Sequence, residues 1–73
     1  MYMENNPLIN KTILQMKFAR VISLLAKKLG VSEERALDVF YSSKTYEYLN
    51  DYRNGLHNMS DGYLVNEVLS EFR

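Results

Sequence analysis

The sequence predicts an all-α fold, a compact four-helix orthogonal bundle around a long first helix. In four segments the apolar residues recur at steps of three or four, which places them on one side of a helix. No segment alternates polar and apolar residues over a useful length, as a half-buried strand does. The chain of 73 residues has the size of one domain. We expect residues 1–9 to be a loose lead-in and residues 10–73 to form a single helical domain.

The first helix is predicted by the stretch from Thr12 to Gly30. Its apolar side consists of Leu14, Phe18, Val21, Leu25 and Leu29. Gly30 is expected to end the helix, because glycine adopts a left-handed backbone conformation without a steric penalty. Two starts compete. One is Pro7 after an Asn6 cap, and the other is Asn10, which we favour.

Serine residues predict where three further helices begin, because a serine hydroxyl caps the first free backbone N–H groups of a helix. Ser32 precedes a second helix, whose buried side is expected to consist of Ala36, Leu37, Val39, Phe40 and Tyr41. Ser43 precedes a third helix, which is expected to continue until Asn54 and Gly55 stop it. Ser60 precedes the last helix, whose apolar face is expected to consist of Leu64, Val65, Val68, Leu69 and Phe72. Across the chain, we expect the core to include Phe18, Val21, Leu25, Phe40, Leu49, Val68 and Leu69.

Charge is balanced over the chain but distributed unevenly along it. Residues 1–32 carry five basic groups and one acid, whereas residues 33–73 carry four basic groups and eight acids. This pattern predicts attraction between a basic first helix and the acidic remainder, and the alternative is an anionic partner. The chain has no cysteine, and no apolar run approaches the roughly 20 residues of a membrane span. We therefore expect a cytoplasmic protein that does not enter a membrane.

Catalytic, metal and cofactor sites are not predicted. His57 is the only histidine, and neither Asp51 nor Asp61 completes a catalytic set with it. We expect His57 to have a structural role in the turn after Gly55, as Gly30, Ser32 and Ser60 do at helix ends. Without a second His or any Cys, and with three glycines in all, neither a transition-metal site nor a phosphate-binding loop is expected. The protein is therefore not expected to be an enzyme.

The outer side of the first helix is the predicted surface for a protein partner. Two aliphatic residues project there amid four basic ones, which is the layout of an apolar interface centre with a charged rim. Tyrosine is also enriched in interfaces, and one tyrosine of the third helix points away from its two neighbours. The candidate partner-binding residues are Ile13, Lys17, Arg20, Leu24, Lys27, Lys28 and Tyr46. The partner is either another protein or a second copy of the chain in a homodimer.

Residues 26–32, AKKLGVS, are similar to the turn of a helix-turn-helix motif. The helix that would enter DNA opens with Glu33 and Glu34, which phosphates would repel. The sequence therefore argues against nucleic acid as a partner. A DNA-binding transcriptional regulator remains the alternative interpretation.

From about Leu14 to Phe72 the chain resembles a family of short bacterial proteins, a domain of unknown function. The resemblance depends on AKKLGVSEERALDVF with its Leu-Gly-x-Ser turn, on residues 46–49, on the pair Leu56-His57, and on residues 63–65. It implies an all-helical cytoplasmic protein, encoded beside a larger protein that looks like an ADP-ribosyltransferase. On this basis we expect a small interaction module that regulates or neutralises its neighbour, as an antitoxin does. The family implies no catalytic residues.

Overall fold

The computed structural model of the protein describes residues 7–51 and 55–72. These residues form four α-helices: α1 (Pro7–Leu29), α2 (Glu33–Tyr41), α3 (Lys44–Leu49) and α4 (Asp61–Ser70). A single 3-10 turn, η3 (Leu56–Asn58), precedes α4. No strand occurs in this part of the chain, so the all-α prediction is confirmed.

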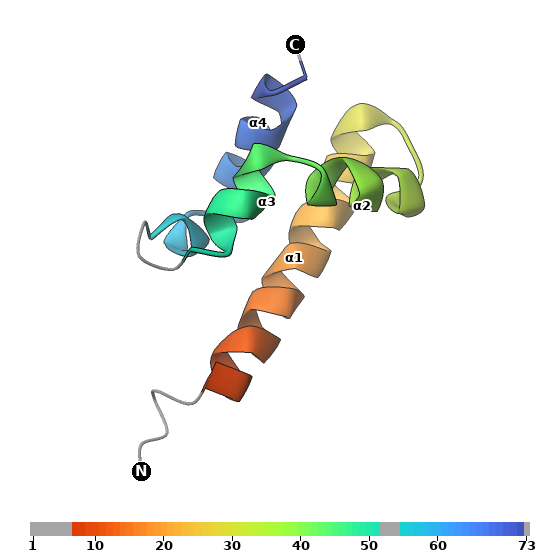
Figure 1. Ribbon diagram of the computed structural model, residues 1–73. Coiled ribbons are helices and arrows are strands. Elements are labelled where there is room, and N and C mark those ends of the chain that lie inside the picture. The colour runs from red at the N-terminus through yellow and green to blue at the C-terminus, as the bar shows by residue number, and fades with distance from the viewer. Residues whose placement is uncertain (1–6, 52–54, 73) are drawn as a thin grey trace.

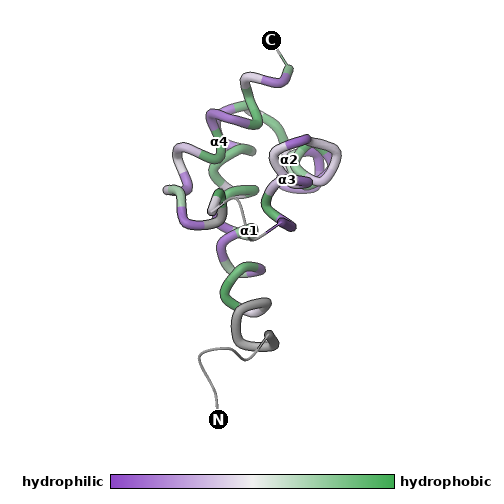
Figure 2. Tube along the Cα trace, turned by 60° about the vertical axis from the view of Figure 1, so that its left-hand side comes forward, coloured by the Kyte–Doolittle hydropathy of each residue, from purple (hydrophilic) through white to green (hydrophobic). Residues whose placement is uncertain are grey.

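The long helix α1 packs against both α2 and α4 (Figure 1). Helix α3 contacts α2, α4 and η3. The N-terminal end of α1 projects beyond the other helices (Figure 1). Figure 2 shows hydrophobic and hydrophilic residues alternating along the turns of α1 and α4, as expected of helices with one buried side.

The helix α1 begins at Pro7, not at the favoured Asn10. Proline suits the first helical position, because its fixed φ is helical and the N–H that it lacks would have no partner inside the helix. Residues 7–9, which we assigned to the lead-in, therefore belong to α1.

The corner between α1 and α2 has the predicted glycine conformation. Gly30 has a φ of 69°, and the N–H groups of Gly30 and Val31 both donate to the carbonyl oxygen of Ala26, at 2.9 and 3.1 Å. The bond from Val31 is the six-to-one bond of a Schellman motif, which satisfies a carbonyl at the end of the helix. The corner therefore fixes where α2 leaves α1.

All three predicted serine caps are present. The hydroxyl oxygen of Ser32 accepts a bond from Arg35 N–H, and Ser43 and Ser60 accept in the same way from Tyr46 and Tyr63. Helix α3 is shorter than predicted and ends at Leu49, because Asn50 and Asp51 are poor helix formers whose side chains compete for backbone bonds. The expected end at Asn54 lies outside the described residues. Gly55 has a φ of 72° before η3.

The core lies where α1, α2, α3 and α4 meet. Its buried apolar residues are Leu14, Phe18, Val21, Ile22, Leu25, Ala26, Ala36, Phe40, Leu49, Leu64, Val65 and Val68. Six of the seven predicted core residues are among them, and the seventh, Leu69, is partly buried against the cluster.

Four apolar residues expected on buried faces are exposed: Leu29, Leu37, Tyr41 and Phe72. Leu29 is the last residue of α1, and Phe72 lies beyond the end of α4. On α2, the stripe of Ala36 and Phe40 already faces the core, so a helix of nine residues leaves Leu37 and Tyr41 on another side.

Candidate functional site

One carboxylate of α4 binds both Lys17 and Arg20, although 55% of the Arg20 side chain is exposed. Lys17 Nζ lies 3.0 Å from Asp61 Oδ1, and Arg20 Nε lies 2.9 Å from Asp61 Oδ2. Only 15% of the Lys17 side chain is exposed. The predicted attraction between the basic first helix and the acidic remainder is thus present in the structure, and it occupies two of the predicted partner-binding residues.

Asp61 is well placed to bridge these two cations. It is the first residue of α4, where the free N–H groups of the helix also favour negative charge. The hydrogen bonds donated by Arg20, and then by Lys17, lower the pKa of Asp61 below its ordinary value. The carboxylate therefore stays charged at neutral pH and links α4 to α1.

The two aliphatic residues of the predicted surface have different environments. Ile13 is 59% exposed. Leu24 is partly buried and packs against the core. They do not form the single apolar centre that the sequence predicted, because Leu24 is partly buried against the core and Ile13 is exposed. Lys27 and Lys28 are exposed in the last turn of α1, where their charge complements the helix dipole.

Tyr46 is partly buried in an aromatic cluster. Its ring centroid lies 5.7 Å from that of Phe18, 5.5 Å from that of Phe40 and 4.7 Å from that of Tyr41, in edge-on arrangements. Such geometry is the favoured one for aromatic pairs. The ring of Tyr46 thus has a packing role that the sequence did not predict, and its role in binding a partner stays a prediction.

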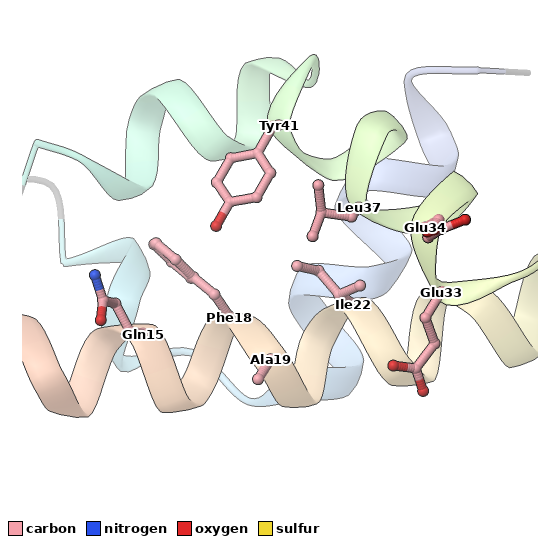
Figure 3. A pocket seen from close by; sticks show the side chains of 8 residues that line it. All are labelled: Gln15, Phe18, Ala19, Ile22, Glu33, Glu34, Leu37 and Tyr41. Carbon is pink, nitrogen blue, oxygen red and sulfur yellow. The ribbon is translucent and has the colours of Figure 1, made fainter.

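The site that the sequence did not predict is a groove between α1 and α2, with a volume of about 340 Å³. Helix α1 provides its floor and α2 its wall (Figure 3). The lining residues are Gln15, Phe18, Ala19, Ile22, Glu33, Glu34, Leu37 and Tyr41. Sequence reasoning assigned Leu37 and Tyr41 to the core. The signal that it missed was that these two residues form a second apolar stripe, four residues apart, beside the stripe of Ala36 and Phe40.

The groove has an apolar centre and polar ends. In Figure 3, Leu37 faces Ile22, and the ring of Tyr41 faces that of Phe18. Glu33 and Glu34 lie at one end and Gln15 lies at the other. Glu33 is positioned by a bond from Ser23 Oγ to its Oε2, at 3.1 Å. Leu37 and Tyr41 are each 44% exposed, so the apolar centre is open to solvent.

The wall of the groove is supported from behind by aromatic packing. The ring of Phe40, which is fully buried, lies 5.2 Å from that of Phe18 and 5.3 Å from that of Tyr41, measured between centroids. These contacts connect the floor and the wall through one buried ring. The groove is thus preformed, which lowers the entropic cost of binding.

Side chains that could bind a metal ion are scattered among the described residues. Among them, no three His, Cys, Asp or Glu side chains lie together as metal ligands do. The backbone of His57 is part of η3, but its side chain lies outside the described part of the structure. The predicted structural role of His57 therefore stays a prediction. No helix in the described part of the chain is long and apolar enough to cross a membrane.

Comparison of the chain with models of protein families, with curated proteins and with solved structures finds no match.

Proposed function

We propose that this protein is a small helical interaction module that binds a protein partner through the groove between α1 and α2. The observation that carries this proposal is the pair Leu37 and Tyr41, each 44% exposed at the mouth of a preformed apolar groove. Single exposed apolar residues are common on protein surfaces. A contiguous apolar hollow with polar ends is instead typical of a surface that binds.

The groove suits a protein ligand better than it suits DNA. The helix-turn-helix alternative requires the start of α2 to approach phosphate groups, and Glu33 and Glu34 are both exposed there. Two of the basic residues that could contact phosphates, Lys17 and Arg20, bond to Asp61. These observations support the choice of a protein partner over a nucleic acid.

The role that we propose for the module is regulation by binding, without catalysis of its own. The resemblance of residues 14–72 to a bacterial family points to a partner encoded nearby, with the character of an ADP-ribosyltransferase. In this proposal the module acts in the bacterial cytoplasm as an antitoxin or inhibitor. Binding through a small preformed groove is sufficient for that role, because a few well-buried anchor residues supply most of the affinity of a protein interface.

Co-purification tests the proposal. The neighbouring protein would be co-expressed with the tagged wild-type chain, with a double variant carrying Leu37→Ser and Tyr41→Ser, and with Ile13→Ser as a matched control. Ile13 is as exposed as the groove residues but lies away from the groove. We expect the wild type and the control to retain the partner and the double variant to lose it.

Thermal melts of the same proteins separate lost binding from lost folding. Ile13→Ser changes an exposed side chain, so its melting temperature should agree with that of the wild type within about 4 °C, since 1 kcal/mol shifts the midpoint of a chain of this size by about 4–8 °C. The double variant also loses the edge-on contacts of Tyr41 with Phe40 and Tyr46, so it should melt at a lower temperature. Co-purification is therefore carried out at a temperature at which the melts show all three proteins folded. Equal retention by all three proteins would contradict the proposal. So would loss of the partner by the Ile13→Ser control alone, or the absence of any complex with the wild type.

A further inference from the structure

We propose that the occupant of the groove is a cationic amphipathic helix of the partner protein. This inference rests on the proposed function and adds the chemistry of the ligand. It depends on three properties of the groove: which elements line it, how its apolar residues are spaced, and which charges lie at its end.

The lining elements favour a helix over an extended peptide. Both sides of the groove are α-helices, α1 and α2, whose backbone groups are used inside the helices themselves. An extended peptide binds by adding to an exposed sheet edge, which the two helices do not provide. The groove therefore offers side-chain contacts alone, which is the way in which an amphipathic helix is bound.

The apolar residues of the groove are spaced for a helical ligand. Leu37 and Tyr41 are four residues apart on α2, and Phe18 and Ile22 are four residues apart on α1. Figure 3 shows them as two facing pairs, Leu37 with Ile22 and Tyr41 with Phe18, one turn apart along the groove. A ligand helix presents its own anchors at the same interval of one turn, at positions i and i+3 or i+4.

The charged residues that line the groove indicate whether its ligand is cationic or anionic. Among the described residues that line the groove, the charged ones are Glu33 and Glu34, and both lie at the same end. A lysine or arginine placed one turn beyond the apolar anchors would meet them, whereas an acidic residue there would be repelled. Ala19, whose side chain is small, lies in the floor and lets a ligand backbone come close.

The size of the groove distinguishes a partner's helix from a second copy of this chain. A stable dimer usually buries about 800 Å² on each partner across a broad contact. A hollow of about 340 Å³ instead suits a few anchor side chains. We therefore place a single helix in the groove, and treat self-association as an outcome that would contradict the inference.

A matched pair of synthetic helical peptides tests the inference. Both carry leucines at positions i and i+4, and one turn away one peptide has two lysines where the other has two glutamates. Binding of labelled peptide to the full chain is measured by fluorescence anisotropy. We expect the cationic peptide to bind about fivefold more tightly than the anionic one at low salt, as a favourable exposed charge pair allows. The difference should disappear near 1 M salt, where charges are screened within about 3 Å.

Variants of the protein then separate the contribution of charge to peptide affinity from the contribution of apolar contact. Glu34→Lys should abolish or reverse the preference for the cationic peptide. Leu37→Ser should weaken the binding of both peptides by about tenfold, because it removes an apolar contact that both peptides make. Ile13→Ser should change neither the affinity for the peptides nor the preference for the cationic one, since Ile13 does not line the groove.

The inference is overturned if the two peptides bind equally at low salt, if neither binds, or if Ile13→Ser weakens binding as much as Leu37→Ser. It is also overturned if the wild type dimerises and Leu37→Ser restores the monomer. The proposed function fails separately. If the co-expressed partner is lost with the double groove variant while the peptides show no charge preference, the groove is the binding surface and its occupant is not a cationic helix.

Discussion

The two sides of α1 differ in how completely they are covered. On the side of α4, Asp61 bonds to Lys17 and Arg20, and Leu64, Val65 and Val68 of α4 are fully buried. On the side of α2, Ala36 and Phe40 are buried, but Leu37 and Tyr41 remain exposed beside an open groove. Both sides use the same central helix, so the difference comes from the helices that pack on it.

The comparison shows how a small bundle buries one apolar stripe of a helix and leaves a second one exposed to solvent. Helix α4 has one apolar stripe and one acidic first residue, and both are satisfied by α1. Helix α2 has two neighbouring apolar stripes, of which Ala36 and Phe40 are buried in the core, while Leu37 and Tyr41 border α1 across the open groove. The stripe that remains outside is then available to another molecule. Four variants or measurements test this difference, from the largest expected effect to the smallest.

Leu25→Ala and Leu37→Ala form the sharpest contrast, because both remove the same atoms. Leu25 is fully buried, so its truncation should lower the free energy of unfolding by about 2–5 kcal/mol through lost transfer energy and a cavity. That is a large part of the stability of so small a domain. Leu37→Ala should cost about 0.5 kcal/mol or less, as surface substitutions do. Urea melts measure both, and equal losses would show that Leu37 belongs to the core.

Glu71→Gln should have the next largest effect. Glu71 ties the end of α4 to the start of α3: Oε1 accepts from Lys44 N–H at 2.8 Å, and Oε2 accepts from Thr45 N–H and Oγ1 at 2.9 and 2.6 Å. Because the amide cannot accept at both positions, we expect a loss of about 1 kcal/mol, similar to the loss of a helix cap. Glu67→Gln, on the same helix, is a control that should have no effect in the same melts.

The pH dependence of Glu71 follows from the same bonds. Partial burial raises the pKa of Glu71, but the bonds from Thr45 and Lys44 outweigh it and hold the pKa below its ordinary value. A carboxylate of this kind contributes stability above its unfolded pKa, and the contribution is lost as the pH falls through the lower folded pKa. The difference between wild type and Glu71→Gln should therefore be constant near neutral pH and shrink below about pH 4. A difference that grows as the pH falls would contradict this reading.

Asp61→Asn should have a smaller effect on stability than Glu71→Gln. The two ion pairs of Asp61 are partly open to solvent, so we expect a loss below about 1 kcal/mol. The pKa of Asp61 is also lowered, so this contribution too should be present at neutral pH and lost in acid. Binding through the groove should not change, because Asp61 does not line it. Loss of partner binding by Asp61→Asn, measured by co-purification, would show that the side of α4 is not purely structural.

Local patterns were sufficient to predict most of the fold. The three serine caps and the glycine at the corner lie within a few residues of the helix ends that they define, so the sequence alone contains them. The buried stripe of α1 was also predictable, because in a long helix the spacing of apolar residues repeats often enough to identify the side that they share. The mistaken predictions are the start of α1, which is at Pro7, the later end of α3, and the burial of Leu29, Leu37, Tyr41 and Phe72.

The candidate site was not predictable, because it depends on contacts between distant residues. Asp61 lies 44 and 41 residues from Lys17 and Arg20, and Glu71 lies 26 residues from Thr45, so no local pattern indicates these bonds. On α2, the five apolar residues cover slightly more than half of the helix circumference, so the sequence offers more than one stripe that could be buried. The packing against α1, which the pattern of α2 does not determine, selects the stripe of Ala36 and Phe40 as the buried one.

Amide chemical shifts of the isotopically labelled chain, recorded with and without its co-expressed partner, test the central claim most directly. The account predicts that the largest shifts fall on residues that line the groove, among them Ala19, Leu37 and Tyr41. The amides of Lys17 and Asp61, on the side closed by α4, should stay nearly unchanged. Shifts concentrated on Ile13, Lys17 and Asp61, with Leu37 and Tyr41 unmoved, would contradict the account and return the binding surface to the outer side of α1.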